Sequence, residues 1–419
     1  MKLLNFFILV LFLTFLCQAE VIRPGAVTAK LKGSGVPFHV SEFGNFGNNS
    51  LASVISRNLN IHGDFAKAAI KQDDANKLDQ ADRQGTIHFQ NWNNLGVEIL
   101  IKGTASGSGF EVKAYYTSGA AFMTKIYNES PSINLGHKIA NDIVRAVTKT
   151  PGFFNARILF TQGDKNTKNV YMCDASGLNG KKLTQYTNNI TTFPAWFPDS
   201  RHILFTSYHK NNHPIMYKLD LSTGKTTTLL AFPGMNQSGA VSADGQNLTA
   251  ILDKDGRPEL YVFNIATSIR KRLTINDAAE ASPCFSPDGR QIVYTSDQGG
   301  RTPQIYIMSI TGKNSSRISQ GRGDATSPDW SPDGKKIAFS ARVGGAFEIH
   351  VYDIASKQIS QITSQGSNME HPTWAPDSRH LVCAKADSSL VIVDSVTGKT
   401  STILTGSRIS TPAFESIKL

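Results

Sequence analysis

The chain has 419 residues, of which 40% are hydrophobic and only 18% are charged. This composition is typical of folded domains with a sizeable core and argues against a disordered chain. The 43 Lys and Arg against 33 Asp and Glu give a formal charge of +10, but these basic residues are scattered without a long run of one sign. That pattern favours a solvated surface over a dedicated polyanion site.

The first 19 residues have the features of a secretory signal peptide. Lys2 gives a short basic start, and residues 3–16 are apolar except at two positions. Small residues at Cys17 and Ala19 favour cleavage between Ala19 and Glu20. The segment is too short for a membrane span, and no later stretch is apolar enough for one. We therefore expect an exported protein.

An arm and a compact domain follow the signal peptide. Residues 20–35 contain Pro24 and several glycines without a sustained hydrophobic period, which predicts a flexible arm. Residues 36–150 are predicted to form an α/β domain with a mixed sheet and two helices. Alternating apolar residues place its strands at 36–40, 97–101, 110–114 and 121–125.

Two apolar patterns at helical spacing predict the helices of this domain. One covers residues 51–59 and follows Ser50, a good helix-capping residue. The other covers residues 135–147, with apolar residues at four-residue steps, and Pro151-Gly152 ends it.

Beyond residue 153, one sequence motif repeats at intervals of 44 or 45 residues. Each copy joins a Pro-x-aromatic run to a Pro-Asp-Gly or Pro-Asp-Ser turn, except that the copy at Gly239–Gln246 is degenerate. The copies are Pro194–Arg201, Gly239–Gln246, Pro283–Arg290, Pro328–Lys335 and Pro372–Arg379. A period of this size is a supersecondary unit that buries its apolar faces only by stacking on copies of itself.

The number of strands in these units predicts a closed ring. The strand after the turn occurs six times, first at Ile158–Thr161, but the run before it occurs only five times. The missing run lies at the far end, as Thr411–Phe414. Residues 153–419 are therefore predicted to form a six-bladed all-β propeller closed by the C-terminal strand. An open solenoid would need polar caps that the sequence lacks.

The repeated side chains are predicted to be structural. The turn aspartates occupy equivalent positions on separate blades and cannot converge on one substrate: Asp199, Asp244, Asp288, Asp333 and Asp377. The repeated aromatics should pack between blades: Trp196, Phe285, Trp330, Trp374 and Phe414. After signal removal three widely spaced cysteines remain, which we expect to be buried without a disulfide framework: Cys173, Cys284 and Cys383.

Signatures of catalysis are missing from the sequence. It contains no Gly-x-Ser-x-Gly elbow, no His-Glu-x-x-His pair and no phosphate loop, and its ten histidines are dispersed. A non-enzymatic protein is therefore predicted. Two alternatives stay open, namely a secreted propeller hydrolase or lyase with catalysis at the channel, and a sensor that binds a small ligand or carbohydrate.

The loops that enter the innermost strands should converge on one mouth of the central channel. They carry Asn236, Asp277, Glu280, Asp324, Glu370 and Arg408. These residues are either ordinary solvated loop residues or a socket for a peptide, and the sequence favours neither. No cofactor is expected, although several acids in one mouth could hold calcium through oxygen ligands, which is the weaker hypothesis.

The order of these parts resembles the TolB family, periplasmic components of the Tol-Pal system of Gram-negative bacteria. The resemblance covers nearly all of the chain after the signal peptide. It is carried by Val36–Phe38, Trp92–Gly96, Val97–Gly103, Pro151–Arg157, Phe285–Gly289 and Tyr294–Arg301.

The resemblance implies a monomeric, non-enzymatic scaffold in the periplasm that maintains outer-membrane integrity and helps envelope constriction during division. It implies that the lipoprotein Pal binds at the propeller mouth, at Met235, Asn236, Ala279, Glu280, Asp324 and Glu370. It implies that TolA binds the arm, at Glu20, Val21, Ile22 and Arg23. It further implies that colicins use the same system. A nucleic-acid partner is not expected, because an exported protein does not routinely meet nucleic acid.

Overall fold

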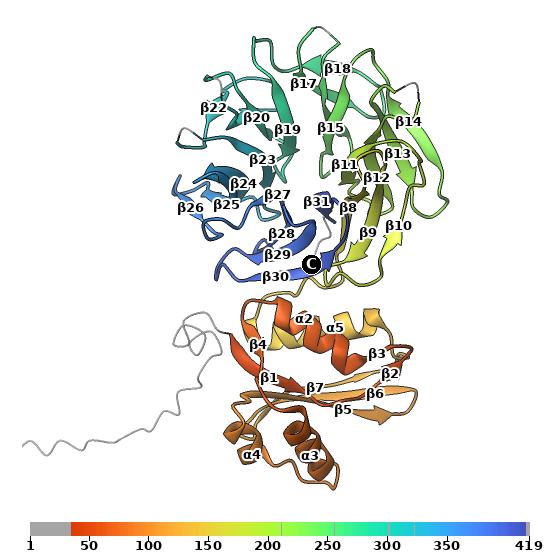
Figure 1. The fold of residues 1–419 in the computed structure, drawn as a ribbon, viewed down its shortest axis with the longest axis vertical. Helices are drawn as coiled ribbons and strands as arrows, with labels where there is room; N and C mark the ends of the chain where they lie inside the picture. The colour runs from red at the N-terminus through yellow and green to blue at the C-terminus, as the bar shows by residue number, and fades with distance from the viewer. Residues whose placement is uncertain (1–34, 211, 255, 301, 322, 416–419) are drawn as a thin grey trace, which may run out of the picture.

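The computed structural model describes residues 35–415, apart from positions 211, 255, 301 and 322. An α/β domain packs beside a ring of six four-stranded sheets (Figure 1). The predicted signal peptide, its cleavage site at Ala19 and Glu20, and the arm segment from Glu20 to Arg23 lie outside the described residues.

The amino-terminal domain is built on a mixed sheet with the strand order β4-β1-β5-β6-β7. The two pairs β1–β4 and β1–β5 are parallel, and the remaining pairs are antiparallel. The strands are β1 (Val36–Val40), β4 (Phe65–Lys67), β5 (Ile99–Ser106), β6 (Gly109–Tyr116) and β7 (Ala121–Tyr127). A small hairpin of β2 (Asn45–Phe46) and β3 (Asn49–Ser50) leads into the first helix.

The two predicted helices, α2 (Leu51–Ile61) and α5 (Ile133–Thr148), pack together between the sheet and the propeller (Figure 1). Each begins at a serine cap. Ser50 Oγ accepts from the N–H of Ser53 at 3.1 Å, and Ser132 Oγ accepts from the N–H of Leu135 at 3.1 Å. Such caps satisfy backbone donors that the first turn of a helix leaves unpaired.

Two further helices, α3 (Gln72–Asp82) and α4 (Phe89–Asn94), were not predicted from the sequence. The buried side of α3 consists of Ala75, Asp79 and Asp82, so an apolar period is missing from its sequence. The two aspartates are buried because Lys102 lies 2.9 Å from a carboxylate oxygen of each. A polar network therefore replaces the apolar stripe that sequence periodicity detects.

Six blades follow, each with four antiparallel strands. The first combines both ends of the propeller: β31 (Ser410–Phe414), β8 (Arg157–Gly163), β9 (Lys168–Asp174) and β10 (Lys181–Lys182). The second and third contain β11 (Thr191–Trp196), β12 (His202–Ser207), β13 (Ile215–Asp220), β14 (Thr226–Leu230), β15 (Asn236–Val241), β16 (Asn247–Leu252), β17 (Glu259–Asn264) and β18 (Arg270–Arg272).

The fourth to sixth blades continue in chain order, with the first strand of each nearest the centre (Figure 1). They contain β19 (Glu280–Phe285), β20 (Gln291–Ser296), β21 (Gln304–Ser309), β22 (Ser316–Arg317), β23 (Ala325–Trp330), β24 (Lys336–Val343), β25 (Ala346–Asp353), β26 (Ile359–Gln361), β27 (Met369–Trp374), β28 (His380–Lys385), β29 (Ser389–Asp394) and β30 (Thr400–Thr405).

The predicted circular closure is confirmed. β31 pairs antiparallel with β8, and Phe414 is 5% exposed. Beyond the strand, the N–H of Glu415 donates to the carbonyl of Arg157 at 2.9 Å, and the Arg157 guanidinium lies 2.5 Å from the Glu415 carboxylate. The C-terminal strand thus completes the blade that β8 began.

The repeated motifs have the structural roles that the sequence predicted. Turn carboxylates accept backbone N–H groups of their own turns, as Asp288 does from Arg290 at 3.0 Å. The five repeated aromatic side chains are buried, with exposed fractions of 4–7%. The indole of Trp374 also donates to the carbonyl of Asp329 on the neighbouring blade, at 3.2 Å. The aromatics therefore join adjacent blades as well as filling space.

The amino-terminal domain contacts the first and last blades at the end of the ring that carries the Asp turns. Arg57 of α2 donates to the carbonyls of Ser176 and Ile403 at 2.7 and 2.8 Å. Lys399, in the turn between β29 and β30, donates to the carbonyls of Asn60 and Phe65 at 2.8 and 2.9 Å. One hydrophobic core continues across this boundary.

Candidate functional site

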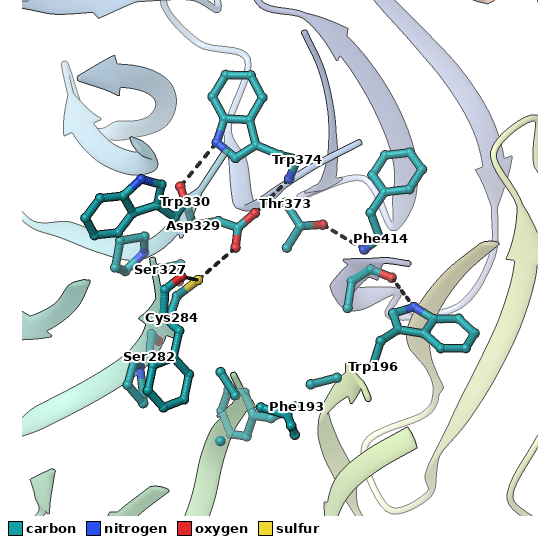
Figure 2. A pocket seen from close by; sticks show the side chains of 18 of the residues that line it. Phe193, Trp196, Ser282, Cys284, Ser327, Asp329, Trp330, Thr373, Trp374 and Phe414 are labelled. Atoms are coloured by element: carbon teal, nitrogen blue, oxygen red, sulfur yellow. Dashed lines mark hydrogen bonds between the residues drawn. The ribbon is translucent and has the colours of Figure 1, made fainter. Parts of the chain in front are cut away.

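The six innermost strands enclose a central cavity of about 710 Å³. Figure 2 shows side chains of several blades pointing toward this space. Concave sites of this size between repeated elements are where propellers and similar folds bind ligands. The channel is therefore the candidate site.

A ring of six bulges shapes the channel. In each innermost strand one lining residue has a positive φ, between 47° and 56°: Phe193, Ser238, Ser282, Ser327, His371 and Thr411. The pairing with the next strand shifts register at this point in every blade. A proline follows in five blades and Gly239 in the third. Bulges re-aim side chains, and strained backbone of this kind clusters at functional sites.

A second ring of side chains lies two residues further along each strand. It is apolar in three blades and polar in the other three, where Cys284, Asp329 and Thr373 follow one another. Cys284 Sγ lies 3.3 Å from Asp329 Oδ1, and the N–H of Trp374 donates to Asp329 Oδ2 at 2.8 Å (Figure 2). Burial raises the pKa of Asp329 to about 6. The channel wall is therefore chemically asymmetric.

The cysteine prediction is only partly confirmed. All three cysteines are free, and Cys173 and Cys383 are buried. Cys284 instead lines the channel and is partly exposed. Its strand position was visible in the sequence, but the bulge that turns it toward the channel was not.

Glu280 is the most perturbed of the predicted mouth residues. It begins β19 and is only 3% exposed. Asn276 Nδ2 donates to its Oε1 at 3.0 Å, while its buried Oε2 has no hydrogen-bond partner. Burial raises its pKa to about 7. An acid that is kept partly unsatisfied at a mouth is a candidate binding group.

Three other predicted mouth residues, Met235, Asn236 and Ala279, have mostly structural roles. Asn236 is fully buried, and its side chain hydrogen-bonds to Phe232 and Gly234 within its own loop. Met235 packs beside the core of the third and fourth blades. Ala279 is exposed, and its N–H donates to Asp297 Oδ1 at 2.8 Å. The Asn236 side chain therefore fixes loop shape and is not free for a partner.

Arg342, which was not predicted from the sequence as a site residue, acts on both Asp324 and Glu370. Arg342 Nε lies 3.2 Å from Asp324 Oδ2. Burial raises the pKa of Glu370, and Arg342 partly offsets this. The Arg342 guanidinium also lies 4.3 Å from the ring centroid of Phe347. The sequence signal was the Gly344-Gly345 pair, which allows β24 and β25 to extend to eight residues each.

The structure neither identifies a metal site nor tests the calcium prediction. Within residues 35–415, leaving out the four undescribed positions, no group of three or more His, Cys, Asp or Glu is arranged to hold a metal ion. Calcium binding stays a prediction. In the same part of the chain, no helix is long and apolar enough to cross a membrane.

Family models match both domains. Residues 144–417 match the TolB beta-propeller domain, and residues 26–116 match the TolB amino-terminal domain. The chain belongs to the TolB family. A crystal structure of TolB from Acinetobacter baumannii is similar to the chain, with a TM-score of 0.75 and 23% identity, over 91% of this chain and 96% of that one. This similarity supports the two-domain fold.

Curated relatives carry the same family name. A "Protein TolB homolog" of Chlorobium chlorochromatii is 32% identical over 218 residues, which are 50% of this chain and 49% of the relative. A "Tol-Pal system protein TolB" of Francisella tularensis subsp. holarctica is 31% identical over 222 residues, 50% of this chain and 48% of the relative. The matched region thus spans about half the length of each relative.

Proposed function

We propose that the protein is a non-enzymatic scaffold of a Tol-Pal system in the periplasm. In this proposal the Pal lipoprotein binds at the propeller mouth and TolA binds the arm that begins at Glu20. The assembly would maintain outer-membrane integrity and envelope constriction during division. Membership of the TolB family and the Tol-Pal name of the relatives support this proposal.

The position of the mouth carries the proposal. Glu280 and Glu370 stand at the entering ends of β19 and β27. The amino-terminal domain contacts the opposite end of the blades, through Arg379 and Lys399. The mouth is therefore open to a partner while the two domains stay packed.

The composition of the mouth suits a protein partner. Ile275 is 80% exposed, and it lies in the loop that ends at the buried Glu280. Phe347 and Arg342 stand on the long hairpin of the fifth blade. Protein interfaces combine such apolar and Arg contacts with a polar rim, and a few central residues supply most of the binding energy.

The enzyme alternative has one observation in its favour. Ser327 Oγ lies 2.9 Å from His371 Nδ1, and both residues line the channel. A nucleophile–base pair also needs a group that orients the base, and among the described residues no carboxylate is bonded to His371. Each of the two residues also occupies the bulge position that all six blades share. The scaffold reading therefore stands ahead of the hydrolase reading.

The proposal is tested by measuring Pal affinity after changing Glu280 and Asp324 together to Ala. We expect a loss of at least about tenfold, which corresponds to about 1.4 kcal/mol. Glu111 and Glu129 changed together to Ala form the control, because they lie on the amino-terminal domain. Unaltered affinity of the mouth variant would show that this surface does not bind Pal.

The arm is tested separately, by deleting residues 20–32 and measuring binding to TolA. Lost binding with an unchanged affinity for Pal is the expected result. If TolA still binds, the arm has no part in its recognition. A pull-down from envelope extract adds an independent readout, in which a peptidoglycan-binding lipoprotein supports the scaffold and release of a small product supports an enzyme.

A further inference from the structure

Lys168 is a half-buried cation at the channel mouth without a carboxylate partner. It begins β9 of the first blade, and its Nζ donates to Ser410 Oγ at 2.8 Å. Among the described residues no acid lies within ion-pair distance of it. Arg157 and Arg379, which are also partly buried, are paired with Glu415 and Asp394. A buried charge without a counter-charge is costly unless something else compensates it.

Hydroxyl groups converge beside this ammonium group. Thr161 Oγ1 lies 2.9 Å from Ser410 Oγ and 3.0 Å from Thr411 Oγ1. Ser410 and Thr411 belong to the closing strand β31, and Thr411 lines the channel. Hydroxyls supply neutral donors that orient an anion next to a charged one.

Further positive charge surrounds the site. Burial and nearby Arg408 lower the pKa of Lys168, and burial and Lys168 in turn lower the pKa of His371 to about 4. The neighbouring acid, Asp164, accepts the N–H groups of Asn166 and Thr167 with its Oδ1 at 2.7 and 2.8 Å, and these bonds together with the nearby Arg408 lower its pKa. Lys168 and Arg408 thus place two positive charges near one carboxylate, that of Asp164, so this part of the mouth carries positive potential.

The opposite side of the mouth carries an acidic group, Glu280, where this side carries a basic one. The innermost strands contact one another in the ring order β31, β11, β15, β19, β23, β27. The blade of β19, which holds Glu280, thus faces the blade of β31 and Lys168 across the channel. One side holds a buried carboxyl group with one oxygen that has no hydrogen bond, and the other holds an ammonium group without a counter-charge.

We propose that Lys168 and Ser410 form a carboxylate-binding subsite, which takes an acidic side chain of the protein segment that docks at the mouth. The inference rests on the proposed function, because it assumes that the mouth binds a protein. Lysine provides a point charge, and the hydroxyl next to it provides a charge-assisted hydrogen bond to the same carboxylate. The subsite would fix the direction in which the segment lies across the channel.

The test is an NMR titration of the purified protein at constant ionic strength. The probes are a capped tripeptide with a central aspartate, its asparagine counterpart and inorganic phosphate. We expect the aspartate peptide to give saturable shifts of the Ser410 and Thr411 amides, with at least about tenfold weaker binding of the asparagine peptide. Equal binding of the two peptides would overturn the proposal. Saturation by phosphate alone would do the same, because the site would then take a free anion and not a peptide carboxylate.

Substitutions identify the residue responsible. Lys168→Met keeps the methylene chain and removes the charge, so the aspartate peptide should lose at least about tenfold in affinity, and Lys168→Arg should restore most of it. Lys181→Met is the matched control, since Lys181 is exposed on the outermost strand of the same blade. Unchanged peptide affinity in Lys168→Met would overturn the assignment.

The outcome separates this subsite from the proposed function. If Pal binding falls in the Glu280 and Asp324 variant but not in Lys168→Met, the mouth binds Pal without the subsite and only this inference fails. If the aspartate peptide binds through Lys168 while the affinity for Pal is unchanged in both variants, the subsite exists and the proposed partner is wrong.

Discussion

Arg379 and Asp64 join the two domains through a pair of hydrogen bonds, with Nη1 and Nη2 of the arginine 2.6 and 3.0 Å from the two carboxylate oxygens. The same guanidinium binds Asp394 at 3.0 and 2.7 Å. Burial would raise the pKa of both aspartates, but the hydrogen bonds from Arg379 hold each pKa below its usual value. A side chain at Gly63 would collide with Asp394, because a Cβ there would lie 1.7 Å from Oδ2.

We predict that Arg379→Met lowers the free energy of unfolding by about 3–5 kcal/mol, because it leaves the Asp64 and Asp394 carboxylates without their arginine counter-charge. Urea denaturation at pH 7, followed by fluorescence of the buried tryptophans, measures this change. A loss below about 1 kcal/mol would mean that the domain boundary does not depend on this ion pair.

The second blade contains a matched control for that experiment. Arg201 and Asp220 occupy the same motif positions and form an ion pair at 2.6 Å, but the Arg201 side chain is 55% exposed and, among the described residues, hydrogen-bonds only within its own blade. Arg201→Met should therefore shift the urea midpoint far less than Arg379→Met. Equal shifts would show that the motif stabilises its own turn and not the contact between domains.

Glu280 should make stability depend on pH. Its pKa is about 7 in the folded chain, above the usual value of 4.5, so the folded state binds its proton more tightly than the unfolded state. The resulting stabilisation is fully present below pH 4.5 and is lost as the pH rises to about 7. We predict that Glu280→Gln increases the free energy of unfolding at pH 8 by roughly 1–3 kcal/mol. At pH 4 the two proteins should have similar stability.

Urea denaturation at both pH values measures this difference. Asp324→Asn is the control, because that carboxylate is ion-paired and 32% exposed. An equal stability gain for Glu280→Gln at pH 4 and pH 8 would show that the carboxyl group is not ionised differently in the folded state.

Closure of the ring should depend on the aromatic side chain of the last strand. Phe414 is 5% exposed, and its ring centroid lies 6.1 Å from that of Phe153, at the junction of the two domains. We predict that Phe414→Ala lowers the free energy of unfolding by about 3–5 kcal/mol. Phe285→Ala, at the equivalent place in a blade of consecutive strands, should lose stability without increasing protease cleavage near residue 157. Limited proteolysis together with calorimetry distinguishes the two effects.

The ring could be predicted from the sequence because each of its features is local and repeated. The turn of residues 287–290 is determined by its own residue types. The count of strands identified Thr411–Phe414 as the missing partner of Ile158–Thr161. Helix α2 was equally visible, since Ser50 and an apolar period mark its start. Helix α3 was not, because Lys102, far along the chain, provides the contacts that bury its acids.

The candidate site was less predictable from the sequence, because its side chains also depend on partners from distant parts of the chain. The sequence placed Asp324 and Glu370 at one mouth, but Arg342, which pairs with Asp324 and partly offsets the raised pKa of Glu370, belongs to a strand and has no motif. Asn236 has the residue type of a binding group, yet its side chain hydrogen-bonds to Phe232 and Gly234 within its own loop. Local sequence shows which residues reach a surface, whereas their partners depend on tertiary contacts.

The six bulges offer a final prediction, in which neighbouring substitutions have opposite signs. Ser282 has a φ of 47°, a region that costs a non-glycine residue about 1 kcal/mol, so Ser282→Gly should stabilise the fold by about 0.5–1 kcal/mol. Ala281 lies one residue earlier with ordinary strand geometry, and Ala281→Gly should destabilise by a similar amount. Thermal unfolding of both variants measures the signs. Loss of stability in both would show that the bulge carries no backbone strain and that the Ser282 side chain itself stabilises the channel wall.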